Sequence, residues 1–197
     1  MKRFTITGFL VLILSITAWV PARGNDWAID ADHSTIQFRI KHIFSTVFGY
    51  FPDFDGTIHF DPENLDQSKF DFTVQVKTIN TAIAKRDTHL RSDDFFAADK
   101  YPVMTFTSSK ITHKQNNAYE VSGTMTIKDI AKEMNIPFVF HGTAPSPFDK
   151  KQIVAGFDTA FSLDRLAFGV GDGKFFNMGV VGDVVDVTIS VEALRTP

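Results

Sequence analysis

Strict alternation of apolar and polar residues is the feature that most limits what this chain can fold into. The stretch KFDFTVQVKT at 69–78 has an apolar side chain at every second position. The same period recurs in STIQFRIKH (34–42), EVSGTMTIK (120–128), IVAGFDTAFSL (153–163) and VVDVTISVEA (184–193). Side chains alternate between the two faces of a strand, so this period predicts antiparallel strands with one buried face and one solvated face.

The number of such segments favours a closed barrel. Less regular stretches near 54–60, 102–111 and 135–143 bring the set to about eight, which is the number that closes a barrel around one ligand. Turn residues separate the segments at 61–64 (DPEN), 115–117 (QNN) and 145–147 (PSP). There is no internal repeat or linker. We therefore predict a single all-β domain, an eight-stranded antiparallel barrel.

One stretch interrupts the strand rhythm and predicts a short helical lid around 82–98. Asn80 or Thr81 can cap a helix that begins at Ala82, and the chain from there to Leu90 contains no Gly or Pro. So short a helix is marginal alone, and we expect Ile83 and Leu90 to dock it on an apolar surface. A further turn capped by Asp94 is expected before the Tyr-Pro pair at 101–102.

The polar residues of this stretch favour a solvated face over an active site. Asp87 and Arg91 are spaced i, i+4, and Arg86 and His89 are spaced i, i+3. These are the spacings of surface ion pairs on helices. The adjacent Phe residues at 95–96 are then predicted to form the apolar underside of the lid.

The first 24 residues have the pattern of a secretory signal peptide. A basic start is followed by an apolar run at 9–20 and by Ala22-Arg23-Gly24, whose small residues suit a signal peptidase. An uncleaved anchor is the alternative. Cleavage would leave a domain of residues 25–197 with 17 basic and 23 acidic residues, a formal charge of −6. No basic run is present, which argues against nucleic acid. We expect a soluble periplasmic protein, and the absence of cysteine excludes disulfides and thiol catalysis.

Histidine and serine spacing gives little support to catalysis. None of the six histidines forms an H-x-x-x-H pair, and there is no G-x-S-x-G motif. His33 and Ser34 are adjacent and point in opposite directions in an extended chain. We therefore predict no catalytic residues, no metal site and no cofactor. A small barrel enzyme using Asp30, His33 and His42 on a lipid head group remains the alternative.

Phenylalanine makes up 21 of the 26 aromatic residues. Phe has no polar group that needs a partner when buried, so this composition fits either a filled core or a lined apolar cavity. A filled barrel would suit a structural or holdase protein.

At the level of motifs, the chain resembles the YceI-like family. The resemblance rests on WAIDADHSTIQFRIKH, GYF, TINTAIAKRDTHLRSDDFFAADKYPVMTFTSSKI, VSGTMTIKD, RLAFGV and VGDVVDVTISVEA, in that order from Trp27 to Ala193. It implies a lipocalin-like barrel in the periplasm that binds a polyisoprenoid or similar amphiphile without catalysis. The lid and late-motif positions carried over include Arg86, Asp87, His89, Leu90, Phe95, Phe96, Tyr101, Pro102, Phe106, Arg165, Phe168 and Gly169.

The candidate site combines the inward strand positions with the lid. The candidate cavity residues are Phe38, Ile40, Phe72, Val74, Phe106, Met125, Phe157 and Phe161. The lid and head-group candidates are Arg86, His89, Phe95, Phe96, Arg165 and Phe168, although Arg165 could instead pair with a carboxylate at the barrel rim. The expected ligand is a long-chain lipid such as a polyisoprenoid or isoprenoid quinone, held for transport or storage, with transient membrane contact.

One position departs from the family pattern. Asp129 stands where the family usually has Gly in the hairpin after GTMTIK. Asp tolerates the left-handed conformation better than most residues. The shape of this end of the barrel is therefore open at the level of sequence.

Overall fold

The computed structural model describes residues 26–196, so the predicted signal peptide at 1–24 lies outside the described residues. The strands are β1 (Asp26–His42), β2 (Ser45–Phe51), β3 (Phe54–His59), β4 (Lys69–Gln75), β5 (Val103–Gln115), β6 (Ala118–Ile127), β7 (Ile130–Pro145), β8 (Ile153–Asp164) and β9 (Val181–Arg195). The helices are α1 (Ala84–Arg91) and α2 (Lys174–Asn177), with 3₁₀ turns at Leu65–Gln67, Val76–Thr78 and Leu166–Phe168. No helix in the described part is long and apolar enough to cross a membrane.

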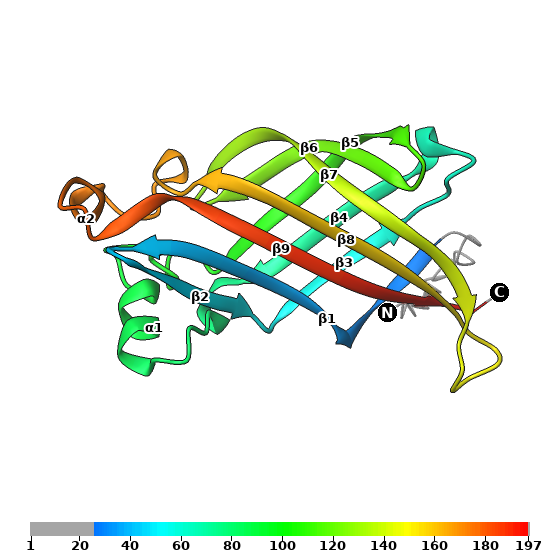
Figure 1. The fold of residues 1–197 in the computed structure, drawn as a ribbon, viewed down its shortest axis with the longest axis horizontal. Coiled ribbons are helices and arrows are strands. Elements are labelled where there is room, and N and C mark those ends of the chain that lie inside the picture. The colour runs from blue at the N-terminus through cyan, green and yellow to red at the C-terminus, as the bar shows by residue number, and fades with distance from the viewer. Residues whose placement is uncertain (1–25, 197) are drawn as a thin grey trace, which may run out of the picture.

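The strands form one closed antiparallel barrel, as the sequence predicted (Figure 1). Each of β3 to β8 pairs with the next strand in sequence, and β9 returns to pair with β1. β2 and β3 both pair with β1, at 36–42 and at 26–27 respectively. They therefore share one barrel position, and nine strands fill eight positions.

The strand β2 was missed from the sequence. Its exposed face carries Phe48 and Tyr50, so apolar residues occupy both faces and the period of two is lost. Tertiary pairing decides its conformation: β1 hydrogen-bonds along one edge, and Asn80 bridges to Tyr50 on the other. The Pro52-Asp53 break then lets the chain leave β2 and continue as β3.

Both described chain ends lie at one end of the barrel (Figure 1). Aromatic rings fill this end. Phe60 is 2% exposed and lies 5.0–5.9 Å, ring centre to ring centre, from five other rings. These rings belong to Phe70, Tyr119, Phe138, Phe140 and Phe157. Most meet edge to face, an arrangement that aromatic pairs prefer. We call this group the aromatic plug.

The opposite end carries α1 and α2 (Figure 1), and the details of the lid differ from the prediction. Ala82 has a left-handed φ of 63°, and the Asn80 side chain accepts the Ala82 N–H. This local turn delays the helix, which begins at Ala84 without a side-chain cap. The residues after α1 form turns and not the extra helical turn expected at Asp94. Leu90 packs inward as predicted, but Ile83 is 51% exposed and does not dock.

The predicted surface ion pairs on α1 are also wrong. Asp87 is 7% exposed, and its Oδ1 accepts hydrogen bonds from the backbone N–H and the hydroxyl of Thr81. Arg91 donates to the Lys77 carbonyl. The helix presents Asp87 to the buried turn at Thr81 and not to solvent, a choice that helical spacing alone does not encode.

The hairpin at Asp129 is regular. β6 and β7 are joined by Lys128 and Asp129 alone, with φ of 51° and 61°, and Ile127 pairs with Ile130. Two positive φ values are the signature of the two-residue turn that suits antiparallel strands. Asp129 thus adopts the left-handed conformation, and the two strands stay paired up to the turn.

Candidate functional site

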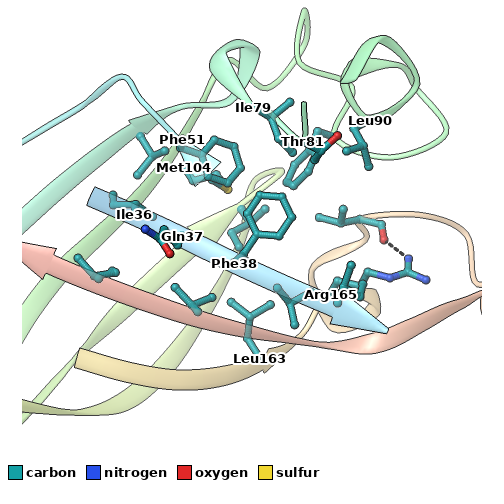
Figure 2. Close-up of a pocket in the computed structure, with 18 of the residues that line it drawn as sticks. Ile36, Gln37, Phe38, Phe51, Ile79, Thr81, Leu90, Met104, Leu163 and Arg165 are labelled. Atoms are coloured by element: carbon teal, nitrogen blue, oxygen red, sulfur yellow. Dashed lines mark hydrogen bonds between the residues drawn. The ribbon is translucent and has the colours of Figure 1, made fainter. Parts of the chain in front are cut away.

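A cavity of about 780 Å³ occupies the barrel between the aromatic plug and the lid segment, residues 82–98. Inward side chains from the strands form its wall, as Figure 2 shows for Ile36, Phe38, Met104 and Leu163. Its surface is almost wholly apolar. The sequence left open whether the interior is a filled core or a lined apolar cavity, and each of these occupies one half of the barrel. The end near the chain termini is filled, and the end near the lid is hollow.

All eight candidate cavity residues line this space. They are Phe38, Ile40, Phe72, Val74, Phe106, Met125, Phe157 and Phe161. Among the lid and head-group candidates, Arg86, His89, Phe95, Phe96 and Arg165 also line it. Phe168 does not. Its ring is 2% exposed and packs with Phe95 and Val170.

Several wall residues were not named from the sequence. Phe51, Ile79, Leu90 and Met104 line the cavity beneath the lid. Leu90 was expected to dock the helix, and Phe51 belongs to the quoted GYF motif. Neither lies in a segment of alternating apolar and polar residues, so periodicity did not identify it as a cavity residue. Val187 and Ile189 also line it, and their alternation in 184–193 was sufficient to find them.

A glycine in β2 shapes the wall. Gly49 lies directly opposite Phe38 in the β1–β2 register. A Cβ at Gly49 would come within 2.4 Å of the Phe38 ring and 2.9 Å of the Thr81 side chain. The glycine therefore lets the Phe38 ring lie directly against the backbone of β2.

The cavity reaches the surface beside α1. Ile83, Lys85 and Thr88 belong to its lining and are exposed. His42 and Val180 line the same end from the β1–β2 turn and from the segment before β9. The mouth is thus bordered by the lid segment, the β1–β2 turn and the loop that contains α2.

Polar groups at the mouth are held in fixed positions. Arg86 donates from Nε to the Thr81 hydroxyl and from Nη2 to the Thr81 carbonyl. His89 Nε2 lies 2.9 Å from Asp94 Oδ2, and its ring stands edge-on to Phe95 and Phe175. A cation and an imidazole therefore lie at the entrance of an otherwise apolar space.

Arg165 forms no ion pair with a carboxylate among the described residues, so the rim pairing offered as its alternative role is not observed. It is 4% exposed and donates from Nε to the Gly182 carbonyl and from Nη1 to the Val170 carbonyl. Its Nη2 is buried with no hydrogen-bond partner among the described residues. Burial lowers the pKa of its guanidinium, although nearby carboxylates oppose that shift. Such a group chiefly ties the turn after β8 to β9.

Lys128 fastens the lid to the rest of the barrel. Its Nζ donates to the Phe95 carbonyl and to the Gly169 carbonyl, each at 2.6 Å. These carbonyls belong to the lid segment and to the turn that ends Leu166–Phe168. The hairpin turn therefore joins both covering segments at one point, while α1 is anchored separately through Thr81.

The residues of the enzyme alternative are not brought together. His42 lines the cavity near its mouth, whereas His33 is 62% exposed in a bulge of β1 that is nine residues away along the strand. At about 3.3 Å per residue, that separation is roughly 30 Å. The geometry gives no shared site for Asp30, His33 and His42.

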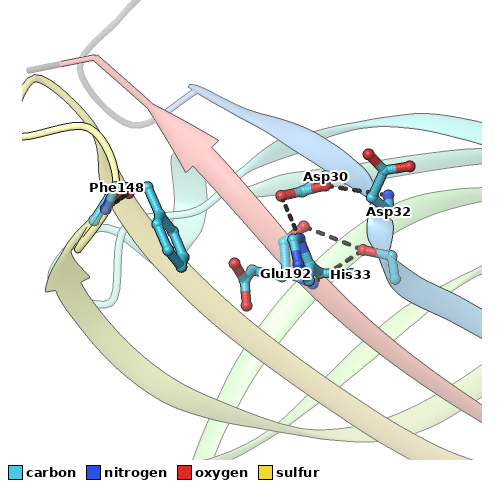
Figure 3. Close-up of polar contacts among 7 residues, drawn as sticks. Asp30, Asp32, His33, Phe148 and Glu192 are labelled. Atoms are coloured by element: carbon cyan, nitrogen blue, oxygen red, sulfur yellow. Dashed lines mark hydrogen bonds and ion pairs between the residues drawn. The ribbon is translucent and has the colours of Figure 1, made fainter.

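His33 instead belongs to an outer cluster with Asp30 and Glu192 (Figure 3). Its Nδ1 lies 2.9 Å from Asp30 Oδ2. This hydrogen bond is the main cause that raises the pKa of His33 and lowers the pKa of Asp30. The Ser34 hydroxyl donates to the Glu192 carbonyl and accepts from the Glu192 N–H, which holds the bulge against β9. None of Asp30, His33 and Glu192 belongs to the cavity lining, so the cluster lies apart from the cavity.

These features define a class: a closed antiparallel β-barrel, filled at one end, with a deep apolar cavity beneath a short helical lid at the other. Residues 27–193 match the family described as the YceI-like domain, and the chain belongs to that family. The resemblance seen in its motifs is therefore confirmed.

Individual relatives agree with this assignment. The chain is 32% identical to protein YceI of Shigella flexneri over 173 residues, which cover 86% of this chain and 87% of that protein. The crystal structure of Burkholderia cenocepacia BcnA superposes with a TM-score of 0.74 at 26% identity, covering 85% of this chain and 99% of that one. A polyisoprenoid binding domain from Saccharophagus degradans has the same fold, with a TM-score of 0.63, 15% identity and coverage of 87% and 98%.

Proposed function

We propose that this protein binds a long-chain amphiphile, such as a polyisoprenoid, an isoprenoid quinone or a similar lipid, and holds it for transport or storage without catalysis. The observation that carries the proposal is the apolar cavity of about 780 Å³, within the 300–1,000 Å³ range typical of small-molecule sites. The description of the Saccharophagus degradans domain as polyisoprenoid binding adds support at the level of the fold.

The shape of the cavity favours a chain over a compact ligand. Along β9 its lining runs from Val181 to Val191. Ten residues at about 3.3 Å each, tilted by roughly 40° from the barrel axis, give a length of roughly 25 Å. That exceeds one leaflet of a bilayer, about 15 Å of hydrocarbon. Each CH₂ moved from water into such a space contributes about 0.8 kcal/mol, so binding from water is strongly favoured.

We propose an orientation for the ligand from the two ends of the cavity. The inner end of the cavity is lined by rings of the aromatic plug, such as Phe70, and by aliphatic side chains, such as Ile58. The mouth offers the Arg86 guanidinium, the His89 imidazole and the exposed Lys85. In this proposal the apolar tail enters first, and the polar head stays near α1.

A periplasmic location is part of the proposal. It is supported by the basic start, apolar run and small-residue site within residues 1–24. Intact-mass analysis of the periplasmic fraction is expected to match residues 25–197. A mass that includes residues 1–24 in the membrane fraction would contradict a soluble carrier.

The direct test is extraction of the purified protein with organic solvent followed by mass spectrometry. We expect a long-chain lipid at close to one molecule per protein. The apo protein should then bind prenyl alcohols with affinity that rises with chain length until the cavity is full. No bound lipid and no binding of prenyl alcohols or fatty acids would refute the proposal, and turnover of the lipid would favour the enzyme alternative.

A further inference from the structure

Large apolar side chains are exposed at the mouth end of the barrel, where two segments distant in sequence meet. Phe44 at the β1–β2 turn is 95% exposed, and Ile43 is 48% exposed. Phe176 in α2 is 42% exposed, and Met178 after it is 63% exposed. We call these four residues the rim patch. A cluster of exposed large apolar residues usually marks a surface that meets another apolar phase.

The two halves of the rim patch are joined by direct contacts. The Ile43 N–H donates to the Val180 carbonyl at 3.0 Å. Ile43 and Phe176 also line one small surface hollow together with Val180. Val180 in turn lines the main cavity. Figure 1 shows α2 and the β1–β2 turn at the same end as α1. The exposed apolar surface thus runs up to the wall of the cavity.

The backbone is strained at Ile43, one of the exposed apolar residues of the rim patch. Ile43 has a φ of 50°, in the left-handed region where a β-branched residue is a genuine outlier. Glycine or asparagine would relieve that strain in an ordinary turn. Strain retained at an exposed apolar turn points to a role outside folding.

Charge around the rim patch differs from that of the chain as a whole. Residues 25–197 carry a formal charge of −6. Segments 40–52 and 173–182 contribute Lys41 and Lys174 and contain no carboxylate side chain, although Asp53, Asp172 and Asp183 lie directly beyond their ends. Apolar residues with lysines among them suit a surface of anionic lipid head groups over acyl chains.

We infer that the rim patch docks the mouth of the barrel on an anionic lipid bilayer, with Phe44 and Phe176 inserted among the acyl chains. This inference rests on the proposed function, because docking there would let a lipid pass between bilayer and cavity without crossing water. It assigns the patch to a lipid surface and not to a protein partner or a second copy of this chain.

The test uses the chain from Asn25, since residues 26–196 form the closed barrel and its core. Flotation with vesicles of phosphatidylcholine and phosphatidylglycerol, 7:3, measures the bound fraction. A Phe44→Ser/Phe176→Ser variant is expected to lower partitioning at least tenfold. Phe148→Ser is the matched control: Phe148 is 96% exposed, in the β7–β8 loop at the far end, so its loss should change nothing. Lys41→Gln/Lys174→Gln should weaken binding to these vesicles and not to pure phosphatidylcholine.

Several results would overturn docking. They are no binding of the wild-type protein, equal loss in the Phe148→Ser control, or a concentration-dependent dimer that Phe44→Ser abolishes. A soluble fluorescent fatty acid, added without vesicles, reports on the cavity independently. Probe binding without vesicle binding refutes docking alone. Vesicle binding that depends on the rim patch, without probe binding, keeps docking and refutes the cavity function.

Discussion

Replacing Val74 with Trp should shorten the longest chain that the cavity accepts. Val74 lies near the end of β4, faces Phe54 and Met104 across its neighbouring strands, and lines the cavity. The deepest lining residue of β4 is Phe70, four residues closer to the plug. At about 3.3 Å per residue and a tilt of roughly 40°, the space beyond Val74 is roughly 10 Å long.

This length sets the size of the effect. An extended chain advances roughly 1.2 Å per bond, as the protein backbone does, so roughly eight chain carbons occupy the space beyond Val74. An indole across the channel should therefore remove about two isoprene units from the longest chain accepted. At about 0.8 kcal/mol per CH₂, the loss for a long chain taken from water has an upper limit of about 6 kcal/mol. We expect at least a tenfold loss for long chains and little change for short ones.

The assay is competition by prenyl alcohols of increasing length, with thermal stability measured alongside. Val184→Trp is the matched control, because Val184 is 51% exposed on the outer face of β9. If the interior were filled around Val74, overpacking would cost about 1–3 kcal/mol and lower Tm by about 2–12 °C. A lower Tm with an unchanged chain-length profile would refute the cavity argument.

Three further outcomes are expected. Asp87→Ala leaves the hydrogen-bonding groups of Thr81 without their buried acceptor. The free energy of unfolding, measured by denaturant titration, should therefore fall by about 1–3 kcal/mol. An unchanged free energy of unfolding would show that α1 is anchored elsewhere. Hydrogen exchange in 82–98 should slow when ligand binds if this segment gates the mouth, and unchanged exchange in a ligand-bound sample would remove the gating role. NMR titration should find the pKa of His33 above 6.5, returning toward it in Asp30→Asn. The stabilising contribution of His33 is then full below pH 6.5 and lost as pH rises through the raised pKa.

Local periodicity was sufficient to predict the barrel and most of its inner wall. A strand that alternates must turn one set of side chains inward, so Phe72, Phe106 and Phe157 could be assigned before any pairing was known. The tolerance of Asp129 for a left-handed conformation was similarly local, whereas the two-residue length of its turn was left open by the sequence.

Sequence also left the interior undecided, because composition does not distinguish a filled core from a lined space. The aromatic plug and the cavity draw on the same residue type: Phe60 is packed among five rings, whereas Phe38 faces the hollow half. The difference depends on how many rings converge at each level of the barrel.

Tertiary structure alone decided the polar contacts and the exposed surfaces. Asp87 has the spacing of a surface ion pair, yet it is buried because Thr81 offers two donors from the preceding turn. Arg165 donates to two backbone carbonyls, and one of them, that of Gly182, belongs to β9 and not to the turn that contains Arg165. The rim patch exists only because closing β9 against β1 brings Ile43 to Phe176. Periodicity records which face a side chain takes, whereas these partners depend on contacts between segments that only the closed barrel brings together.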